Sequence, residues 1–306
     1  MESNNKQITV VIPYYKGMDT VFNTINSVIE SEKLCDELIV EYILIIDSME
    51  DKKEIVQKVK SIYGKKIRII ENEKNIGVAE SRNKALKEAD FDYVLFLDQD
   101  DFIDQNYFNL MNEGIKENAD LIVSNAYVIN SNNKKKVKMY NKKPNLSFND
   151  FLKGNKILTP GQVMFSKKVA RIENLFTGCS AEFKGADDWA SYINIFIKYR
   201  GVKLYYVKEP VFYYNIHENN YSKNWKELNM SAIKTAEFFI NKVSKSEGNI
   251  LRKNIEFLSF ENQYKDEDYE FNIKDLRKII KYYSYSIFDY NKITHFINKK
   301  LIGFNK

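Results

Sequence analysis

Two aspartates that follow a run of apolar residues are the side chains best placed to do chemistry. Asp98 and Asp100 come after the apolar residues 93–97. Residues i and i+2 at a strand end point the same way, so the two carboxylates would converge on one spot. Converging carboxylates repel unless a cation lies between them, and Mg2+ or Mn2+ accepts oxygen ligands while keeping positions open for phosphate oxygens. We therefore expect a divalent metal ion, Mn2+ or Mg2+, at this pair.

The alternative for these aspartates is helix capping, in which a carboxylate accepts the free N–H groups of a helix start. Asp101 and Asp104 come next, ahead of an amphipathic segment at 105–118. We expect Asp101 and Asp104 to begin that helix, and Asp98 and Asp100 to bind the metal.

The scarcity of histidine and cysteine argues against several other kinds of site. The chain contains two His, His217 and His295, and two Cys, Cys35 and Cys179, without metal-ligand spacing. An ordinary zinc site is therefore not expected, and a Ser-His-Asp or Cys-His enzyme would depend on one of two His. The chain also lacks the GxGxxG and GxxxxGK phosphate loops, which argues against a Rossmann dehydrogenase and a P-loop NTPase.

Strands and helices alternate through the first half of the chain and set where these side chains stand. Such alternation predicts βαβ units and a mostly parallel sheet with helices on both faces. Ligands bind at the carboxyl ends of the strands in such sheets, where Tyr14, Asp47 and Asp98 stand. Apolar runs predict strands at 8–12, 42–46, 67–70, 93–97 and 121–123, and amphipathic spacing predicts helices at 20–31, 50–63, 78–89 and 105–118.

The second half departs from this pattern in two places. Residues 130–145 carry six Lys and few apolar residues, which fits a phosphate-facing loop or, as we favour, a solvated surface hairpin. After residue 222 Pro is absent and the chain reads as helical, so we expect an α/β domain over 1–222 and a helical extension over 223–306. The remaining expected elements are helices at 148–153, 186–199, 226–244, 250–260 and 273–301, and strands at 161–167, 202–207 and 210–214.

Seven short segments, taken in order, resemble the motifs of glycosyltransferase family 2. The similarity runs from about residue 7 to residue 222, and it implies the GT-A fold, a Rossmann-like and mostly parallel sheet flanked by helices. This sequence departs from the family pattern at Lys16, Ser48, Ser81 and Asp187, where Asn, Gly, Ala and Glu are usual. The segments are ITVVIPYY at 8–15, IIDSMED at 45–51, NIGVAESRN at 75–83, FLDQDD at 96–101, TPGQ at 159–162, GADDW at 185–189 and YYNIHENNYS at 213–222.

The resemblance implies a nucleotide-diphosphate-sugar donor, of the UDP-sugar type. Asp47 falls on the position that contacts uracil, with capping of the following helix as its alternative. Arg82 falls on a position that reaches phosphate or base, with a surface arginine as its alternative. Tyr14 or Tyr15 would stack on the base, and either could instead be a core tyrosine. The implied donor site comprises Pro13, Tyr14, Tyr15, Asp47, Gly77, Arg82, Asp98 and Gln99.

The resemblance also implies roles in metal binding and catalysis. It adds His217 to Asp98 and Asp100 as a metal-binding residue, against the alternative of a structural histidine. Asp188 falls on the catalytic-base position, and one base with direct displacement inverts the anomeric centre. The residues implied on the acceptor side are Gln162, Asp187, which would also complement a helix start, and Trp189, which has a core position as its alternative.

The leading hypothesis is therefore an inverting glycosyltransferase, of the hexosyl- or N-acetylhexosaminyl-transferase type. It would act on a hydroxyl of a glycan or lipid-linked acceptor in the synthesis of a cell-surface polysaccharide or glycoconjugate. One alternative is a non-catalytic GT-A-like scaffold that binds nucleotide or glycan. Another is a nucleotidyltransferase, which would use a nucleoside triphosphate.

The net charge of +5 comes from the end of the chain. Residues 271–306 contain eight Lys or Arg and two acids, a net charge of +6, so the other 270 residues sum to −1. This distribution gives no sign of a nucleic-acid partner. Apolar residues recur at three- and four-residue intervals within 271–306, which predicts a basic amphipathic helix. That helix would pack on the protein or on a second copy, or dock on an anionic membrane surface.

The expected location follows from what the sequence lacks. Residues 1–7 are polar and contain no apolar signal segment. No apolar run approaches the roughly 20 residues that a membrane span needs. With its few Cys, the chain is expected in the cytoplasm, either free or peripheral on the inner face of the cell membrane.

Overall fold

A computed structural model describes residues 5–130, 136–176, 185–217 and 224–264. These residues fall into two compact units. The second unit contains the helices expected at 226–244 and 250–260, and it also takes in two segments from earlier in the chain. The first unit holds 5–130, 136–144, 157–176 and 198–217, and the second holds 145–156, 185–197 and 224–264.

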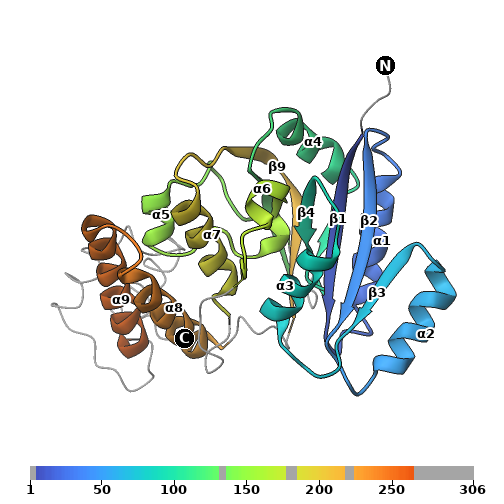
Figure 1. Ribbon diagram of the computed structural model, residues 1–306, viewed down its shortest axis with the longest axis horizontal. Coiled ribbons are helices and arrows are strands. Elements are labelled where there is room, and N and C mark those ends of the chain that lie inside the picture. Colours follow the sequence, from blue (N-terminus) through green and yellow to red (C-terminus); the bar gives the residue numbers. More distant parts are fainter. Residues whose placement is uncertain (1–4, 131–135, 177–184, 218–223, 265–306) are drawn as a thin grey trace, which may run out of the picture. The chain divides into compact units, whose positions relative to one another are not determined.

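Four parallel strands form one side of the sheet in the first unit (Figure 1). In spatial order they are β3 (Ile67–Glu71), β2 (Leu38–Ile46), β1 (Lys6–Tyr14) and β4 (Tyr93–Phe96). Because all four run in the same direction, their carboxyl ends meet at one edge of the sheet. The residues that follow these strands are thereby brought together.

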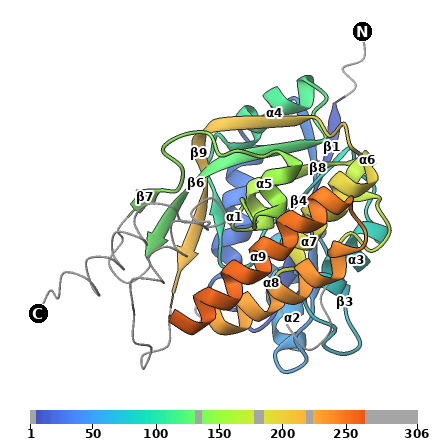
Figure 2. The same cartoon turned by 90° about the vertical axis from the view of Figure 1, so that its left-hand side faces the viewer.

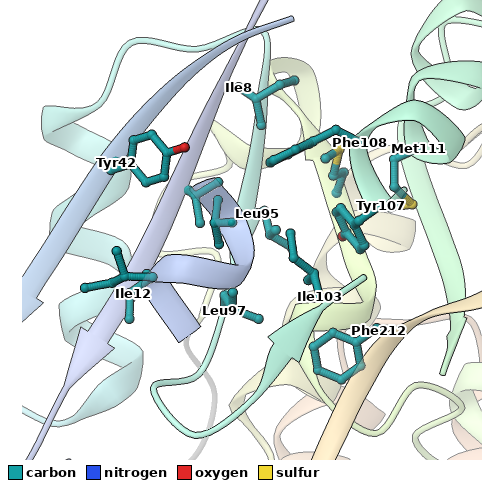
Figure 3. Packing of buried hydrophobic residues seen from close by; sticks show 14 of the residues in the cluster. Ile8, Ile12, Tyr42, Leu95, Leu97, Ile103, Tyr107, Phe108, Met111 and Phe212 are labelled. Atoms are coloured by element: carbon teal, nitrogen blue, oxygen red, sulfur yellow. The ribbon is translucent and has the colours of Figure 1, made fainter. Parts of the chain in front are cut away.

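The central strand β1 is buried on both faces. Ile8, Val10 and Ile12 point into the main core, and Thr9 and Val11 between them are fully buried as well. A strand without a polar face is typical of a parallel sheet covered by helices on both sides. Figure 3 shows the main core around this strand, with Ile8, Ile12, Tyr42, Leu95, Leu97, Ile103, Tyr107, Phe108, Met111 and Phe212.

Strand directions are mixed in the other half of the sheet. Here β8 pairs antiparallel with both β4 and β6, whereas β9 runs parallel to β6. Figure 2 shows β6 and β9 side by side, with β7 next to β6. The expected α/β class is confirmed, with a parallel section and a mixed section in one sheet. The bounds are β5 (Phe102–Ile103), β6 (Leu121–Asn130), β7 (Lys136–Lys138), β8 (Val163–Ser166) and β9 (Leu204–Ile216).

The strands expected at 202–207 and 210–214 form the single strand β9. The pairing with β6 shifts register on both sides of Asn125, which lies opposite Pro210. Proline has no N–H to donate to a neighbouring strand, so the irregularity lets β9 continue past it. The prediction of two separate strands is therefore wrong.

Within the lysine-rich segment 130–145, residues 136–138 form one strand of a hairpin, as expected for a solvated surface. Lys136 begins β7, which pairs antiparallel with β6, and its side chain is exposed. Residues 131–135 lie outside the described residues.

The helices of the first unit follow the predicted spacing closely. Helix α3 begins directly after Gly77, whose φ of 84° lies in the left-handed region that favours glycine. The helices are α1 (Val21–Glu32), α2 (Lys52–Tyr63), α3 (Val78–Glu88), α4 (Tyr107–Lys116) and α6 (Lys167–Ala170), with a 3-10 turn, η1, at Pro160–Gln162.

Four helices make up the described part of the second unit. They are α5 (Phe148–Leu152), α7 (Asp187–Lys198), α8 (Trp225–Ile240) and α9 (Lys245–Tyr264). Helices α8 and α9 lie side by side (Figure 2), and α5 contacts α9. Rings hold α5 to α7, since Phe151 lies 5.2 Å from Tyr192 and 5.5 Å from Phe196 between ring centroids.

Helices at 226–244 and 250–260 are thus confirmed as α8 and α9. The predicted helix at 273–301 and the basic segment 271–306 lie outside the described residues, so their roles stay predictions. Within the described ranges, every helix is too short or too polar to cross a membrane.

The close packing around η1 gives a test of the core. A Cβ added at Gly161 would lie 2.5 Å from a ring carbon of Phe212, which is itself fully buried. We expect Gly161→Ala to lower the free energy of unfolding by about 1–3 kcal/mol, because neither ring nor backbone has room to move. Urea unfolding followed by circular dichroism measures this.

Gly201→Ala is the matched control, because a Cβ there would have no atom within 4 Å. It should leave the free energy of unfolding unchanged. Equal urea midpoints for the two variants would contradict the packing described around Gly161.

Candidate functional site

Polar side chains gather where the parallel strands of the first unit end. Asp47 follows β2, Asn72 follows β3 and Asp98 comes two residues after β4. These are the positions at which open α/β sheets bind ligands. The contacts among them and with β9 define the site.

Asp98 is held by a buried arginine from α3. Its Oδ1 lies 2.6 Å from Nη2 of Arg82, and its Oδ2 accepts a hydrogen bond from the Thr159 hydroxyl at 3.4 Å. The Arg82 side chain is only 4% exposed and lies over the Phe176 ring, 5.5 Å from its centroid. Arg82 is therefore not the surface arginine of the alternative interpretation, and it balances the charge of Asp98.

Asp100 is held by the histidine that directly follows β9. Nε2 of His217 lies 2.7 Å from Oδ2 of Asp100, so the structure brings together two of the predicted metal-binding residues. Burial raises the pKa of Asp100, the nearby Asp98 carboxylate raises it further, and the hydrogen bond to His217 opposes the shift. Burial is the larger cause of this shift, and the smaller contribution of Asp98 is consistent with two neighbouring carboxylates at this strand end.

The metal itself remains a prediction. Within the described ranges, no group of three or more His, Cys, Asp or Glu side chains is arranged to hold a metal ion. The donor set nevertheless fits Mg2+ or Mn2+, because two mutually repelling carboxylates and one imidazole would leave coordination positions for phosphate oxygens. His217 and Asp100, about one quarter exposed, are accessible to such an ion.

Asp101 does not cap the following helix, contrary to expectation. Its Oδ1 accepts the backbone N–H of Asn215 at 2.9 Å, and its carbonyl accepts the Thr24 hydroxyl at 2.7 Å. Helix α4 begins later, at Tyr107, after Asn106. Asp101 instead ties the loop after β4 to β9, which carries Asn215 just before His217.

Burial holds the pKa of Asp101 well above its usual range. Asp100 and Asp98 add to the shift, and the Asn215 N–H opposes it. Asp104 does not cap α4 with its carboxylate either, since Oδ1 accepts the Asn106 N–H at 3.0 Å and Oδ2 accepts the Tyr213 hydroxyl at 2.9 Å.

Asp47 organises the loop that leads into α3. Its Oδ1 accepts hydrogen bonds from the Asn72 amide and the Ile76 N–H, and its Oδ2 accepts the Gly77 N–H, each at 2.8 Å. Capping of α2, the alternative interpretation, is therefore wrong. The contact with uracil stays a prediction, and it is compatible with the free acceptor capacity that one bond leaves on Oδ2.

The two adjacent tyrosines at the end of β1 have different surroundings. Tyr14 is fully buried and its hydroxyl donates to Asp51, which also accepts from Ser48. Burial and this hydrogen bond raise the pKa of Tyr14. Tyr15 is 48% exposed. Stacking of a base on Tyr14 is therefore ruled out by its burial, and Tyr15 is the tyrosine with an accessible ring.

The other three residues of the predicted donor site make contacts within the protein. Pro13 is buried within β1 and pairs opposite Ile45. Gly77 supplies its N–H to Asp47 and begins α3. The Gln99 side chain is directed at the backbone of Tyr15.

Two residues predicted on the acceptor side are internal. Gln162 is fully buried, where its amide donates to the Ser124 carbonyl and accepts from the Leu158 N–H, both at 3.2 Å. Trp189 is 2% exposed and its indole N–H donates to the Phe151 carbonyl at 2.6 Å. Neither side chain can line an acceptor site, so both assignments are wrong. Asp187, in the first turn of α7, is partly exposed.

Asp188, the predicted base, belongs to the second unit. It lies in the first turn of α7, and its Oδ2 accepts a hydrogen bond from the Asn155 amide at 2.9 Å. Its role stays a prediction. Asn155, Asn72 and Asp51 are partners that the sequence interpretation did not identify, and only Asn72 carries a recognisable signal, a polar residue directly after a strand.

Comparison with known proteins identifies the family of this chain. The family model described as Glycosyl transferase family 2 matches residues 9–172. The poly(ribitol-phosphate) beta-N-acetylglucosaminyltransferase TarP of Staphylococcus aureus is 32% identical over 39% of this chain, a match that spans only 36% of TarP. The glucosyltransferase WfaP of Escherichia coli, named as acting on GlcNAc-diphosphoundecaprenol with UDP-Glc, is 26% identical over 72% of this chain and 82% of WfaP.

A solved structure shares the fold. The crystal structure of S. aureus TarS 1–349 in complex with UDP-GlcNAc aligns with a TM-score of 0.63 at 16% identity, over 90% of this chain and 79% of that chain.

The three hydrogen bonds of Asp47 give a prediction about stability. Asp47→Ala would remove one acceptor from the buried Asn72 amide and the acceptor of the half-buried N–H groups of Ile76 and Gly77. We expect the free energy of unfolding to fall by about 3 kcal/mol. Urea unfolding measures it.

Asp19→Ala serves as control, because Asp19 is exposed. Its effect should stay within about 0.5 kcal/mol. If Asp47→Ala were as stable as Asp19→Ala, the loop before α3 would not depend on this carboxylate.

Proposed function

The chain belongs to glycosyl transferase family 2, and we propose that it moves a sugar from a UDP-sugar to a hydroxyl of a glycan or lipid-linked glycan with inversion. The observation that carries the proposal is the contact of His217 with Asp100, two residues after Asp98, at the carboxyl end of the parallel strands. The relatives TarP and WfaP support a role in the synthesis of a cell-surface polysaccharide. A lipid-linked acceptor would locate the reaction at the inner face of the cell membrane.

The donor base would lie against Tyr15. An exposed aromatic ring offers a planar surface for stacking, and Tyr15 has one at the end of β1. Asp47 would accept the uracil N–H through Oδ2. The UDP-GlcNAc complex of TarS, which shares the fold, supports a donor of this kind.

The diphosphate would lie over Asp98 and Asp100. Asp100, Asp98 and His217 would hold a divalent ion, which as a Lewis acid stabilises the charge on the departing diphosphate. Arg82 fixes one oxygen of Asp98, and His217 fixes one oxygen of Asp100. Both carboxylates are therefore oriented before a ligand arrives, which reduces the reorganisation that binding requires.

Asp188 would act as the general base. Its carboxylate would take the proton from the acceptor hydroxyl as the oxygen attacks the anomeric carbon, opposite the bond to the diphosphate. The Asn155 amide, 2.9 Å from Oδ2, orients this carboxylate. A single displacement of this kind inverts the configuration at the anomeric centre.

Removal of the base should slow turnover while leaving donor binding intact. Asp188→Asn keeps the shape of the side chain but cannot accept the proton, so kcat should fall by about 10²–10⁴-fold. The affinity for UDP should stay within about twofold of the original, since an acceptor-side base contributes little to ground-state donor binding. Release of UDP from a panel of UDP-sugars and calorimetric titration with UDP measure the two quantities.

Asp19→Asn, at an exposed position, is the control and should turn over normally. Full turnover by Asp188→Asn would remove Asp188 from the mechanism. If the unmodified chain hydrolysed or transferred no UDP-sugar in the presence of Mn2+, the scaffold hypothesis would replace the enzyme.

Metal dependence tests the carboxylate pair separately. Chelation with EDTA should abolish transfer, and added Mn2+ or Mg2+ should restore it. Asp100→Asn, which removes one charge beside His217, should raise the Mn2+ concentration needed for half-maximal UDP binding at least about tenfold. Unchanged UDP binding and transfer in EDTA would contradict a metal at this site.

A further inference from the structure

Gln99 stands between the two aspartates of the predicted metal site, but its side chain turns away from them. Its Nε2 donates to the Tyr15 carbonyl and its Oε1 accepts the Tyr15 N–H, each at 2.8 Å. The amide thus makes both backbone hydrogen bonds of a single residue, as a neighbouring strand would. A residue in the loop after β4 therefore holds a residue in the loop after β1.

Tyr15 needs such a partner because the sheet ends before it. The pairing of β1 with β2 stops at Tyr14, and the pairing with β4 stops at Val11. The next residue, Lys16, has a φ of 52°, so the chain turns sharply there. The Gln99 amide replaces the missing strand at the point where the exposed Tyr15 ring is presented.

Gly17 makes room for this amide. A Cβ at Gly17 would lie 2.2 Å from Cδ of Gln99 and within 2.5 Å of its oxygen and nitrogen. Any side chain at position 17 would therefore displace Gln99. Gly17 and Gln99 form a matched pair, because the Gln99 amide occupies the space that a side chain at position 17 would fill.

Helix α1 also holds the loop after β4, through the side chain of Thr24. The Thr24 hydroxyl lies 2.8 Å from the Gln99 carbonyl and 2.7 Å from the Asp101 carbonyl. The backbone around Gln99 is therefore fixed to α1 while its side chain is fixed to Tyr15. The loop with Asp98 and Asp100 cannot shift without moving the loop with Tyr15.

We propose that Gln99 is a positioning residue that couples the base-binding part of the donor site to the diphosphate-binding part. It acts through Tyr15, by holding the backbone that presents the ring, and it does not contact the donor. The proposal rests on the proposed function in one respect, namely that Tyr15 stacks on the base. Coupling between two parts of one ligand site is reciprocal, so order imposed at one loop favours binding at the other.

The clamp is tested without any ligand. In Gln99→Ala the Tyr15 N–H loses its acceptor, so its hydrogen exchange, followed by NMR, should accelerate at least about tenfold. Gln57→Ala on the exposed face of α2 is the matched control and should leave that exchange unchanged. Unchanged exchange at Tyr15 in Gln99→Ala would overturn the clamp.

The coupling is tested by calorimetric titration with UDP in the presence of Mn2+. Gln99→Ala should weaken UDP binding on the order of tenfold, because binding must then order the loop that carries Tyr15. Because Gln99 acts through Tyr15, the variant that combines Gln99→Ala with Tyr15→Ala should bind UDP no more weakly than Tyr15→Ala alone. Losses that multiply in the double variant would overturn the proposal.

Gly17→Ala gives an independent test that survives if one variant folds poorly. Alone, it should weaken UDP binding about as much as Gln99→Ala, because the new methyl group displaces the amide. Added to Gln99→Ala, it should cause no further loss. A full additional loss in that background would show that Gly17 serves another purpose and would overturn the matched pair.

Failure of the proposed function gives a different result. An unmodified chain that binds no UDP in Mn2+ would overturn the donor site and the coupling together. Accelerated exchange at the Tyr15 N–H in Gln99→Ala would then still identify the clamp as a structural feature of this edge of the sheet.

Discussion

Two carboxylates held close together at one strand end are the constraint around which the first unit is organised. The Asp98 carboxylate adds to the raised pKa of Asp100, and each of the two aspartates contacts a side chain from another element. Arg82 comes from α3 and His217 comes from the end of β9. The two neighbouring aspartates therefore depend on α3 and β9, which place Arg82 and His217 beside them.

Each of these two elements is in turn anchored by another aspartate. Asp47 accepts hydrogen bonds from the amide of Asn72 and from two backbone N–H groups just before α3. Asp101 accepts the backbone N–H of Asn215, two residues before His217. Buried carboxylates thus act as acceptors for the backbone, which costs desolvation but places the charged partners with little freedom.

Much of this arrangement could be predicted from the sequence, because apolar runs mark the strands and the residues after them mark the edge. Asp98, Asp100 and Asp47 were located on that basis, and Arg82 and His217 through the resemblance. The sequence could not separate Tyr14 from Tyr15, since adjacent residues at a strand end differ only in the direction in which they point. Gln162 and Trp189 were misassigned for a related reason. Polar and aromatic side chains are compatible with a core wherever the backbone offers hydrogen-bond partners, and those partners lie far away in the chain.

The order of the segments along the chain has a consequence for biosynthesis. Strand β9, with Leu204–Ile216, lies between β6 and β5 within the sheet of the first unit, so that sheet stays open until these residues leave the ribosome. The second unit begins with residues 145–156 but lacks α8 and α9 until residue 264 is made. Neither unit can complete its core before most of the polypeptide is synthesised, so the nascent chain must carry unpaired strand edges and apolar helix faces for most of its elongation.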